Sequence, residues 1–327
     1  ARAAGHEVSC LTLASHDNLE VGIARRCAQM ANMPFRYIEN RPHGLSAHFD
    51  AAARASDGLF TAPFNLFGAL PDIARSHDVL LSGHGLDYTL RGYYLPCAMV
   101  RLAGSLTRLP KLRAIPDGKP KTVSDSLRVG LNAHALQAVL SPRARAGWDE
   151  RRVGAMALAL SSADIEDPYN AWDAFVLHCL GRHTAYNDFV AMNTVIAHRA
   201  IAFDPDILDL YYAMKPAWRA SGRMAHAAMK SLAPDLMALP DANSGLSANN
   251  GFAKQAVLMF MRGAARRVGL SARPAPPADA TWTHGSWSNL HELLRRDAFF
   301  VERLRGLAEN TALLDSGLFD PQGLARI

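Results

Sequence analysis

The sequence has no hydrophobic run long enough to cross a membrane. No stretch approaches the ~18 consecutive apolar residues that a membrane-spanning helix needs. The densest late run, Ala256–Met261, is flanked by Lys254 and Arg262. The first residues also lack the basic-then-apolar pattern of a signal peptide. We therefore expect a protein that has no membrane partner.

Cysteine is scarce, with four in 327 residues, and no two are spaced as Cys-x-x-Cys. A disulfide scaffold is therefore not expected, and reduced thiols favour a cytoplasmic location. The excess of basic residues is small, because 35 Lys and Arg stand against 30 Asp and Glu. No strand interleaves basic and aromatic residues, so we do not expect nucleic acid as a partner.

The first hundred residues alternate between apolar bursts and helical patterns. Residues 7–14, 35–38 and 78–81 are predicted as strands. Between the first two, residues 19–33 place apolar side chains at helical spacing behind the capping sequence Ser15-His16-Asp17-Asn18. This order predicts parallel strands joined by helical crossovers, which is an α/β fold.

The later sequence differs from the first hundred residues in composition and in its pattern of apolar residues. Residues 98–118 are basic and are interrupted by Pro110 and Pro116, and from residue 122 onward the Ala, Leu and Arg content predicts helices. Turns are expected near four pairs that end in proline: Ser141-Pro142, Asp167-Pro168, Asp204-Pro205 and Lys215-Pro216.

The most informative segment reads Leu-Leu-Ser-Gly-His-Gly-Leu-Asp-Tyr over residues 80–88. It places Ser82, Gly83, Gly85 and Asp87 directly after a predicted buried strand, where ligands bind in open α/β sheets. Glycines let the backbone approach an anion, and an aspartate there can hold Mg²⁺ against phosphate oxygens. The alternative is an ordinary glycine turn in which Asp87 caps a helix.

This segment and the Arg-Gly-Tyr turn at residues 91–93 resemble the synthetase domain of glutamine-hydrolysing asparagine synthetases. Relatives of that family make β-lactams or cyclise lasso peptides. The family segment reads SGxGxDE and is followed by a GGY-like turn. Six residues match it: Ser82, Gly83, Gly85, Asp87, Gly92 and Tyr93. Two positions depart from it, because Tyr88 replaces the second acid and His84 replaces a frequent acid between the glycines.

A second block, residues 192–204, resembles the family pattern M-x-x-x-x-E-x-R-x-P-F-x-D. Three residues fall in register: Met192, Arg199 and Asp204. Ala197 stands at the glutamate position, and residues 239–246 contain no lysine where asparagine synthetases carry one. Because residues 319–324 also resemble the family's C-terminal end, the resemblance extends over nearly the whole chain.

The resemblance implies a Rossmann-like, pyrophosphatase-loop fold that binds ATP and Mg²⁺. The domain would comprise an α/β nucleotide-binding core, residues 1–97, and a helical portion, residues 98–327. In the family, ATP adenylates a carboxylate and an amine then attacks to form an amide. The product would be asparagine or a specialised amide, lactam or macrolactam. The implied partners are a small-molecule or peptide carboxylate and ammonia from an upstream glutaminase domain.

The resemblance also gives roles to individual residues. Asp87 would bind Mg²⁺, and Ser82, Gly83 and Gly85 would form the phosphate-binding loop. Leu13 and Ser15, at the end of the first strand, would line the adenine pocket. Tyr93 and Arg199 would act catalytically, by orienting the substrate and by stabilising charge. Each has a structural alternative: a helix cap, core packing, aromatic packing, or an ion pair from Arg199 to Asp204 or Asp206.

The family's phosphate loop, SGGxDS, is absent from the sequence. Because residues 1–6 look like the last turn of a helix with a glycine stop, we expect a fragment whose loop lies upstream. The departures at Tyr88 and Ala197 and the missing lysine favour an alternative, a non-catalytic relative that serves as a binding or scaffold module. A thiolation enzyme of the wider pyrophosphatase-loop group is a third interpretation, which the helical second half disfavours.

Overall fold

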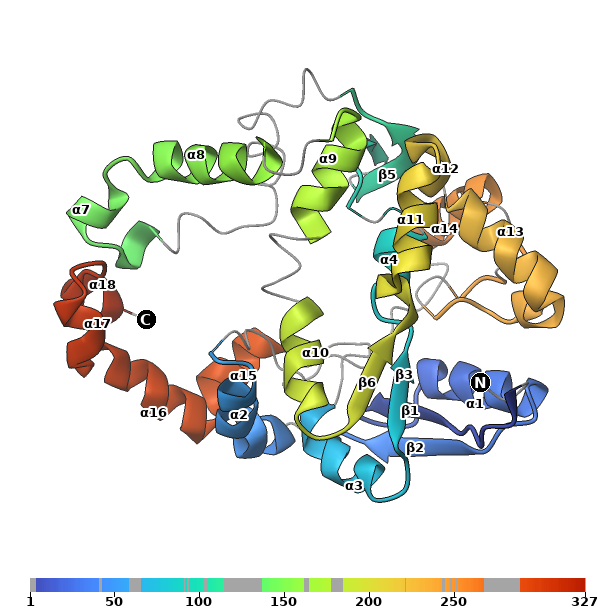
Figure 1. The fold of residues 1–327 in the computed structure, drawn as a ribbon, viewed down its shortest axis with the longest axis horizontal. Helices are drawn as coiled ribbons and strands as arrows, with labels where there is room; N and C mark the ends of the chain where they lie inside the picture. The colour runs from blue at the N-terminus through green and yellow to red at the C-terminus, as the bar shows by residue number, and fades with distance from the viewer. Residues whose placement is uncertain are drawn as a thin grey trace.

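The computed structural model describes residues 4–40, 43–58, 66–90, 92, 94–102, 105–114, 137–161, 165–177, 185–220, 222–242, 245–247, 249–250, 252–267 and 289–326. The structure contains both helices and short strands, and Figure 1 shows the strands grouped on one side of the molecule. The α/β character expected from the sequence is therefore confirmed at this level.

The first part of the chain alternates between strands and helices, as expected up to residue 90. Its elements are β1 (Cys10–Ala14), α1 (Leu19–Met30), β2 (Phe35–Glu39), α2 (His43–Ala55), η2 (Phe67–Ala69), α3 (Leu70–Ala74), β3 (Val79–Ser82), α4 (Leu86–Thr89) and β4 (Cys97–Leu102). The helix expected over 19–33 ends at Met30, because Asn32 adopts a left-handed backbone conformation with φ of 51°.

The second part is mostly helical. Its elements are β5 (Ser105–Leu112), α7 (Pro142–Arg145), α8 (Trp148–Ser161), α9 (Pro168–Phe175), α10 (Ala185–Asn193), β6 (Ala197–Ala200), η5 (Ile201–Phe203), α11 (Pro205–Ala213), α12 (Pro216–Ala220), α13 (Arg223–Leu232), η6 (Pro234–Ala238), α14 (Phe252–Arg267), α15 (Leu290–Arg296), α16 (Ala298–Gly306), η7 (Leu307–Glu309), α17 (Thr311–Asp315) and α18 (Pro321–Leu324).

At each of the four expected turns, the chain begins a new helix. Pro142, Pro168, Pro205 and Pro216 each occupy the first position of a helix. Proline suits that position because its fixed φ matches the helix and its missing N–H would have had no partner there.

Two strand regions correct the sequence-based expectation. Residues 98–118 carried no strand prediction, yet β4 and β5 form an antiparallel hairpin there. The second half was expected to be largely helical, with no strand predicted in it, yet β6 lies there and pairs in parallel with β3. The β6 sequence Ala-His-Arg-Ala has little strand propensity, so its strand conformation depends on pairing with β3.

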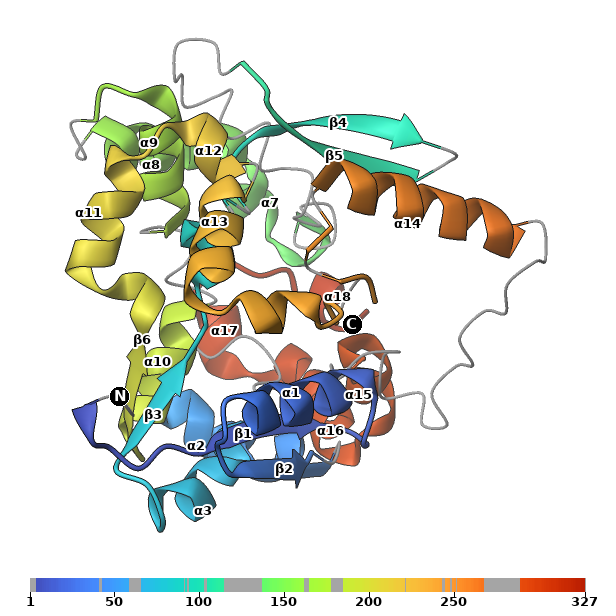
Figure 2. The same cartoon turned by 90° about the vertical axis from the view of Figure 1, so that its right-hand side faces the viewer.

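The parallel strands form two separate pairs in the described part of the chain. β1 pairs with β2, from Cys10 opposite Phe35 to Ala14 opposite Glu39. β3 pairs with β6, from Val79 opposite Ala197 to Ser82 opposite Ala200. Figures 1 and 2 show the two pairs running in different directions. The structure is thus a mixed α/β fold with small parallel sheets.

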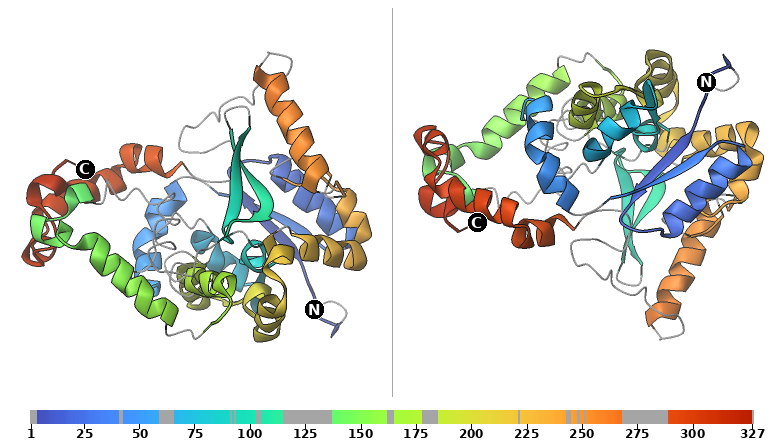
Figure 3. Two further views of the ribbon diagram at one scale, coloured as in Figure 1. Left: turned by 90° about the horizontal axis from the view of Figure 1, so that it is seen from above. Right: turned by 90° about the horizontal axis from the view of Figure 1, so that it is seen from below.

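The largest hydrophobic core packs α2, α3 and α10 around β3. Its buried residues are Ala52, Phe67, Leu70, Ile73, Leu80, Ala191, Met192 and Ile196. A second core joins the C-terminal helices to α2 through Leu45, Leu293 and Phe300, and Figure 3 shows α2 beside this C-terminal group. Across the described residues, every helix is too short or too polar to span a lipid bilayer.

Candidate functional site

The β3–β6 pair brings the two motif-bearing segments of the sequence together. β3 ends at Ser82, the first residue of the Ser-Gly-x-Gly-x-Asp segment, and β6 carries Arg199 of the second block. Because the strands are parallel, both segments leave the sheet at the same edge, with Ser82 opposite Ala200. This edge is the one at which α/β folds bind their ligands, so we take it as the candidate site.

A hydrogen bond joins the two segments at this edge. The Ser82 hydroxyl lies 2.9 Å from Nε2 of His198, which is only 3% exposed. The Ser82 hydroxyl oxygen also accepts from the backbone N–H of His84 at 3.4 Å. The Nδ1 atom of His198 is buried and has no hydrogen-bond partner among the described residues. Ser82 therefore has a defined orientation, whereas His198 lacks the second partner that would complete a Ser-His-Asp arrangement.

Aromatic rings surround the two histidines. The Phe189 ring stacks on His198 with centroids 4.7 Å apart and meets the edge of His84 at 5.3 Å. Phe203 contacts Phe189 at 5.3 Å. Burial, followed by the nearby charges of His84 and Arg199, lowers the pKa of His198 to about 4. His198 is therefore a neutral imidazole at physiological pH.

The two loop positions, 83 and 85, differ in whether they require glycine. Gly85 has φ of 87°, and a Cβ there would lie 2.8 Å from the Phe203 ring and 3.0 Å from the Ala202 side chain. Gly83 has no left-handed conformation, and a Cβ there would lie 3.5 Å from Leu86, an ordinary contact. Only Gly85 is therefore needed by the backbone and by packing against residues 202–203.

The remaining expected residues of the second block have structural contacts. Arg199 is exposed and donates to the carbonyl of His198 at 2.9 Å and to Oδ1 of Asn193 at 3.4 Å. In the described structure it forms no ion pair with Asp204 or Asp206. Asp204 instead caps α11, where its carboxylate accepts from the N–H of Asp206 at 3.0 Å.

Leu13 and Ser15 belong to the other parallel pair. Leu13 lies in β1 opposite Ile38, and the Ser15 hydroxyl lies 2.8 Å from Nδ1 of the exposed His16. Between them, the carbonyl of Ala14 accepts from the N–H of Asn40 at 2.9 Å and from the Tyr37 hydroxyl at 3.1 Å. Among the described strands, β1 is hydrogen-bonded to β2 and not to β3, so within the described structure Leu13 and Ser15 do not share a sheet with Ser82.

Two expected site residues are not placed by the structure. Tyr93 and the side chain of Asp87 lie outside the described residues, although Asp87 belongs to α4. Among the described side chains, no group of three or more His, Cys, Asp or Glu is arranged to hold a metal ion. Asp87, the Mg²⁺ ligand expected from the sequence, is not among these described side chains.

The turn that follows α4 is held by close packing. Gly92 has φ of 52°, and a Cβ there would lie 2.9 Å from the carbonyl carbon of Arg219. Trp172 Nε1 donates to the carbonyl of Tyr94 at 2.8 Å. The Tyr88 and Tyr94 rings lie 4.6 Å apart. Tyr88, which replaces the family's acid, is therefore part of the packing between α4 and this turn.

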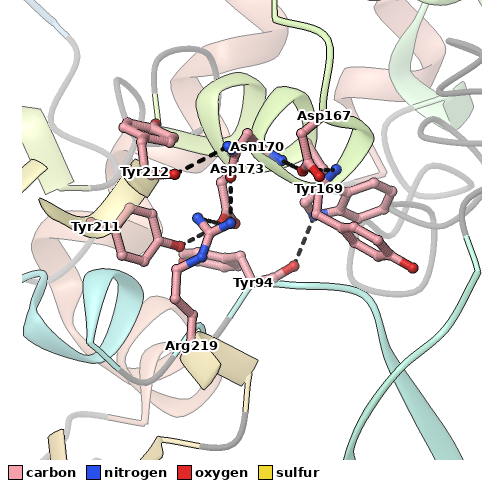
Figure 4. A network of polar contacts seen from close by, with 9 residues as sticks. Tyr94, Asp167, Tyr169, Asn170, Asp173, Tyr211, Tyr212 and Arg219 are labelled. Atoms are coloured by element: carbon pink, nitrogen blue, oxygen red, sulfur yellow. Dashed lines mark hydrogen bonds and ion pairs between the residues drawn. The ribbon is translucent and has the colours of Figure 1, made fainter. Parts of the chain in front are cut away.

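A buried polar network lies behind the turn (Figure 4). Arg219 is fully buried, and its Nη1 donates to Oδ2 of Asp173 at 3.0 Å. Tyr211 donates to the same oxygen, and its ring lies 4.4 Å from the Arg219 guanidinium carbon. Arg219 also donates to Oδ1 of Asn170, whose amide donates to the carbonyl of Tyr212 at 3.3 Å. The network joins α9, α11 and α12 behind the Gly92 turn.

The network contains the ion pair between Arg219 and Asp173, and both side chains are shielded from solvent. Burial raises the pKa of Asp173 to about 7, while the Tyr211 hydrogen bond and the Arg219 charge act in the opposite direction. Burial also raises the pKa of Tyr211, and the charge of Asp173 adds to that rise. Loss of either charged partner would leave the other buried and uncompensated.

The residues that form these contacts were not among the site residues expected from the sequence. His198 precedes Arg199 inside a block that was already matched, but nothing local showed that its strand pairs with β3. Asp173, Tyr211 and Arg219 lie in three different helices. Their only sequence signal is a set of polar residues within helices that are otherwise apolar.

Comparisons of the chain with protein-family models, with curated proteins and with solved structures found no match.

We predict that Gly85→Ala lowers the free energy of unfolding by about 2–4 kcal/mol, because it adds a strained left-handed residue and a steric overlap with Phe203. The matched substitution Gly83→Ala should change it by less than about 1 kcal/mol. Urea denaturation of both variants measures the difference. Equal effects would contradict the described loop conformation.

We predict that His198 makes the fold sensitive to acid. Its pKa is about 4 in the folded chain and higher when unfolded, so its contribution to stability is lost as the pH falls through that interval. The loss is about 3 kcal/mol between about pH 7 and about pH 4. In His198→Gln this part of the loss should disappear, whereas the exposed His226→Gln should behave like the original protein. Denaturation curves recorded across this pH range measure the loss in each variant. An equal loss of stability in His198→Gln and His226→Gln would contradict the prediction.

We predict that Asp173→Asn lowers the free energy of unfolding by about 3–5 kcal/mol, because it removes the counter-charge of the buried Arg219. Asp149→Asn, which breaks an exposed ion pair with Arg152, should cost no more than about 1 kcal/mol. Thermal or urea unfolding measures both. A small effect of Asp173→Asn would show that water reaches Arg219.

Proposed function

We propose that the protein forms amide bonds in an ATP-dependent reaction, by adenylating a carboxylate that an amine then attacks. The observation that supports this most is the pairing of β3 with β6. Two sequence blocks that resemble the same family, separated by more than a hundred residues, leave the sheet at one edge. A chance resemblance gives no reason for the blocks to meet there.

ATP and Mg²⁺ are the cofactors of the proposed reaction. ATP would supply the adenylyl group with pyrophosphate as the leaving group, and the metal would neutralise the phosphate charge. The amine would then displace AMP from the acyl-adenylate. In this proposal the loop of Ser82, Gly83 and Gly85 approaches the phosphates, and Asp87 is the metal ligand. Tyr93 orients the substrate carboxylate. Leu13 and Ser15 contribute backbone groups to the adenine side.

In this proposal, the hydrogen bond to His198 holds the Ser82 hydroxyl in one orientation. Because His198 is neutral and buried, it orients the Ser82 hydroxyl without adding charge to the edge of the sheet. Arg199 supplies the positive charge, since its guanidinium is exposed beside the end of β6. The carboxylate substrate would be a small molecule or a peptide, and the amine would be ammonia or an amine on a substrate.

A second candidate function is a binding or scaffold module that does not catalyse. Two observations favour it. Ala197, at the family's glutamate position, is exposed in β6 and offers no carboxylate. Tyr88, at the family's second acid, packs against Tyr94 instead. Such a protein would bind nucleotide at the same edge without activating a carboxylate.

We expect the protein as its gene encodes it to exchange labelled pyrophosphate into ATP when Mg²⁺ and a mixture of amino acids are supplied. Asp87→Asn should lower the exchange rate at least about 100-fold, because charge stabilisation at the phosphates is lost. Asp149→Asn, on the exposed face of α8, should leave the rate unchanged.

Titration calorimetry with MgATP separates the two candidates. Binding without exchange would favour the non-catalytic module. The absence of both binding and exchange would contradict the proposed function and its alternative together.

A further inference from the structure

Helix α1 has two apolar faces, and only one of them is covered by the sheet. Val21 and Ala28 are fully buried on the inner face. On the opposite face, Leu19, Ile23 and Met30 follow one another at helical spacing, and Leu19 and Met30 are 59% and 43% exposed. A helix that is apolar on both sides is normally covered on both sides. The outer face of α1 is therefore a surface without its full complement of contacts.

This outer face forms one wall of an open groove of about 450 Å³. The opposite wall is η6 and the two residues after it, with Leu239 buried beneath the surface. Figure 2 shows α1 running below the segment that follows α13. The volume falls within the usual range of small-molecule pockets, roughly 300–1,000 Å³.

Both walls are held in place by their own contacts. Asn18 caps α1 by accepting from the N–H of Val21 at 3.2 Å. On the other side, the carbonyl of Met237 accepts from the Ser247 hydroxyl at 3.0 Å and from the N–H of Asn249 at 2.9 Å. A ligand would thus meet walls that are already ordered, which reduces the entropic cost of binding.

The groove carries one charge of each sign. Arg26 lines it from α1 and Asp235 lines it from η6. Within the part of the chain that the structure describes, neither side chain forms an ion pair, with the other or with a third residue. A guanidinium matches a carboxylate, and a carboxylate matches an ammonium group. A ligand that bears both groups on an apolar body would satisfy the two charges and cover the apolar wall.

We propose that this groove is a binding site for a zwitterionic apolar ligand of amino-acid or dipeptide size. The ligand's carboxylate pairs with Arg26, its ammonium group pairs with Asp235, and its side chains lie against part of the apolar row formed by Leu19, Ile23 and Met30. An extended dipeptide spans about 7 Å, and the row from Leu19 to Met30 spans about 16 Å, so the site has room for it. The site is separate from the edge of the β3–β6 pair and needs no ATP.

Gly22 offers a sharp test, because it lines the groove between Leu19 and Ile23. A Cβ at Gly22 would meet nothing within 4 Å, so a larger side chain can begin there without a clash and extend toward the groove. Gly154 in α8 is the matched control, since it is also helical and also has open space around it. Both substitutions to leucine should favour their helices, because glycine is a poor helix former.

The experiment is titration calorimetry of the full chain with L-leucyl-L-leucine. We expect binding that Gly22→Leu abolishes and Gly154→Leu leaves unchanged. Arg26→Gln and Asp235→Asn should each weaken binding about tenfold, which corresponds to one lost charge-assisted contact of about 1.4 kcal/mol. N-acetyl-leucyl-leucine amide, which has no charges, and glycylglycine, which has no apolar body, should bind at least about tenfold more weakly.

Three binding results would overturn the proposal, and so would one result on the oligomeric state. The binding results are no binding of the dipeptide to the original chain, equal binding by Gly22→Leu and Gly154→Leu, and equal binding of the charged and blocked peptides. A concentration-dependent dimer that Gly22→Leu removes would also overturn it, because a second copy of the chain would then cover the groove. None of these results depends on pyrophosphate exchange, so this proposal and the proposed function can fail separately.

Discussion

The parallel pairing of β3 with β6 is the contact on which the rest of the site depends. The two strands are separated by residues 83–196, so closing this loop costs conformational entropy that the short ladder must offset. Part of the compensation comes from the core, where Leu80 of β3 packs with Met192 and Ile196 just before β6. Since the strands run in parallel, the segments that follow them leave at one edge. The contact between Ser82 and His198 exists only because of this pairing.

Two buried polar side chains, His198 and Arg219, are stabilised in different ways. His198 has no acidic partner, and burial together with nearby positive charge favours its neutral form. Arg219 has no exposed surface, so its guanidinium needs its partners inside the protein. It is accommodated by Asp173, Tyr211 and Asn170. The first arrangement fixes the end of β3 without adding charge. The second holds the helices that support the Gly92 turn at the cost of a buried ion pair.

Local signals predicted the elements best. Asn18 caps α1, and proline begins α7, α9, α11 and α12, because these effects act within one turn of helix. The three expected strands were found within a few residues of their predicted bounds. The β4–β5 hairpin was missed because basic residues and Pro110 concealed its pattern. Strand β6 was missed because Ala-His-Arg-Ala has no strand signal of its own.

The sequence by itself determined the alternation of strands and helices, the helix starts and the two motif blocks, because each depends on residues close together in the chain. The tertiary structure alone decided which strands pair, that Ser82 meets His198, and that Arg219 is buried beside Asp173. These contacts join residues that lie 116 and 46 positions apart. Their electrostatics follow from burial, which is a property of the packed molecule and leaves no mark on the local sequence.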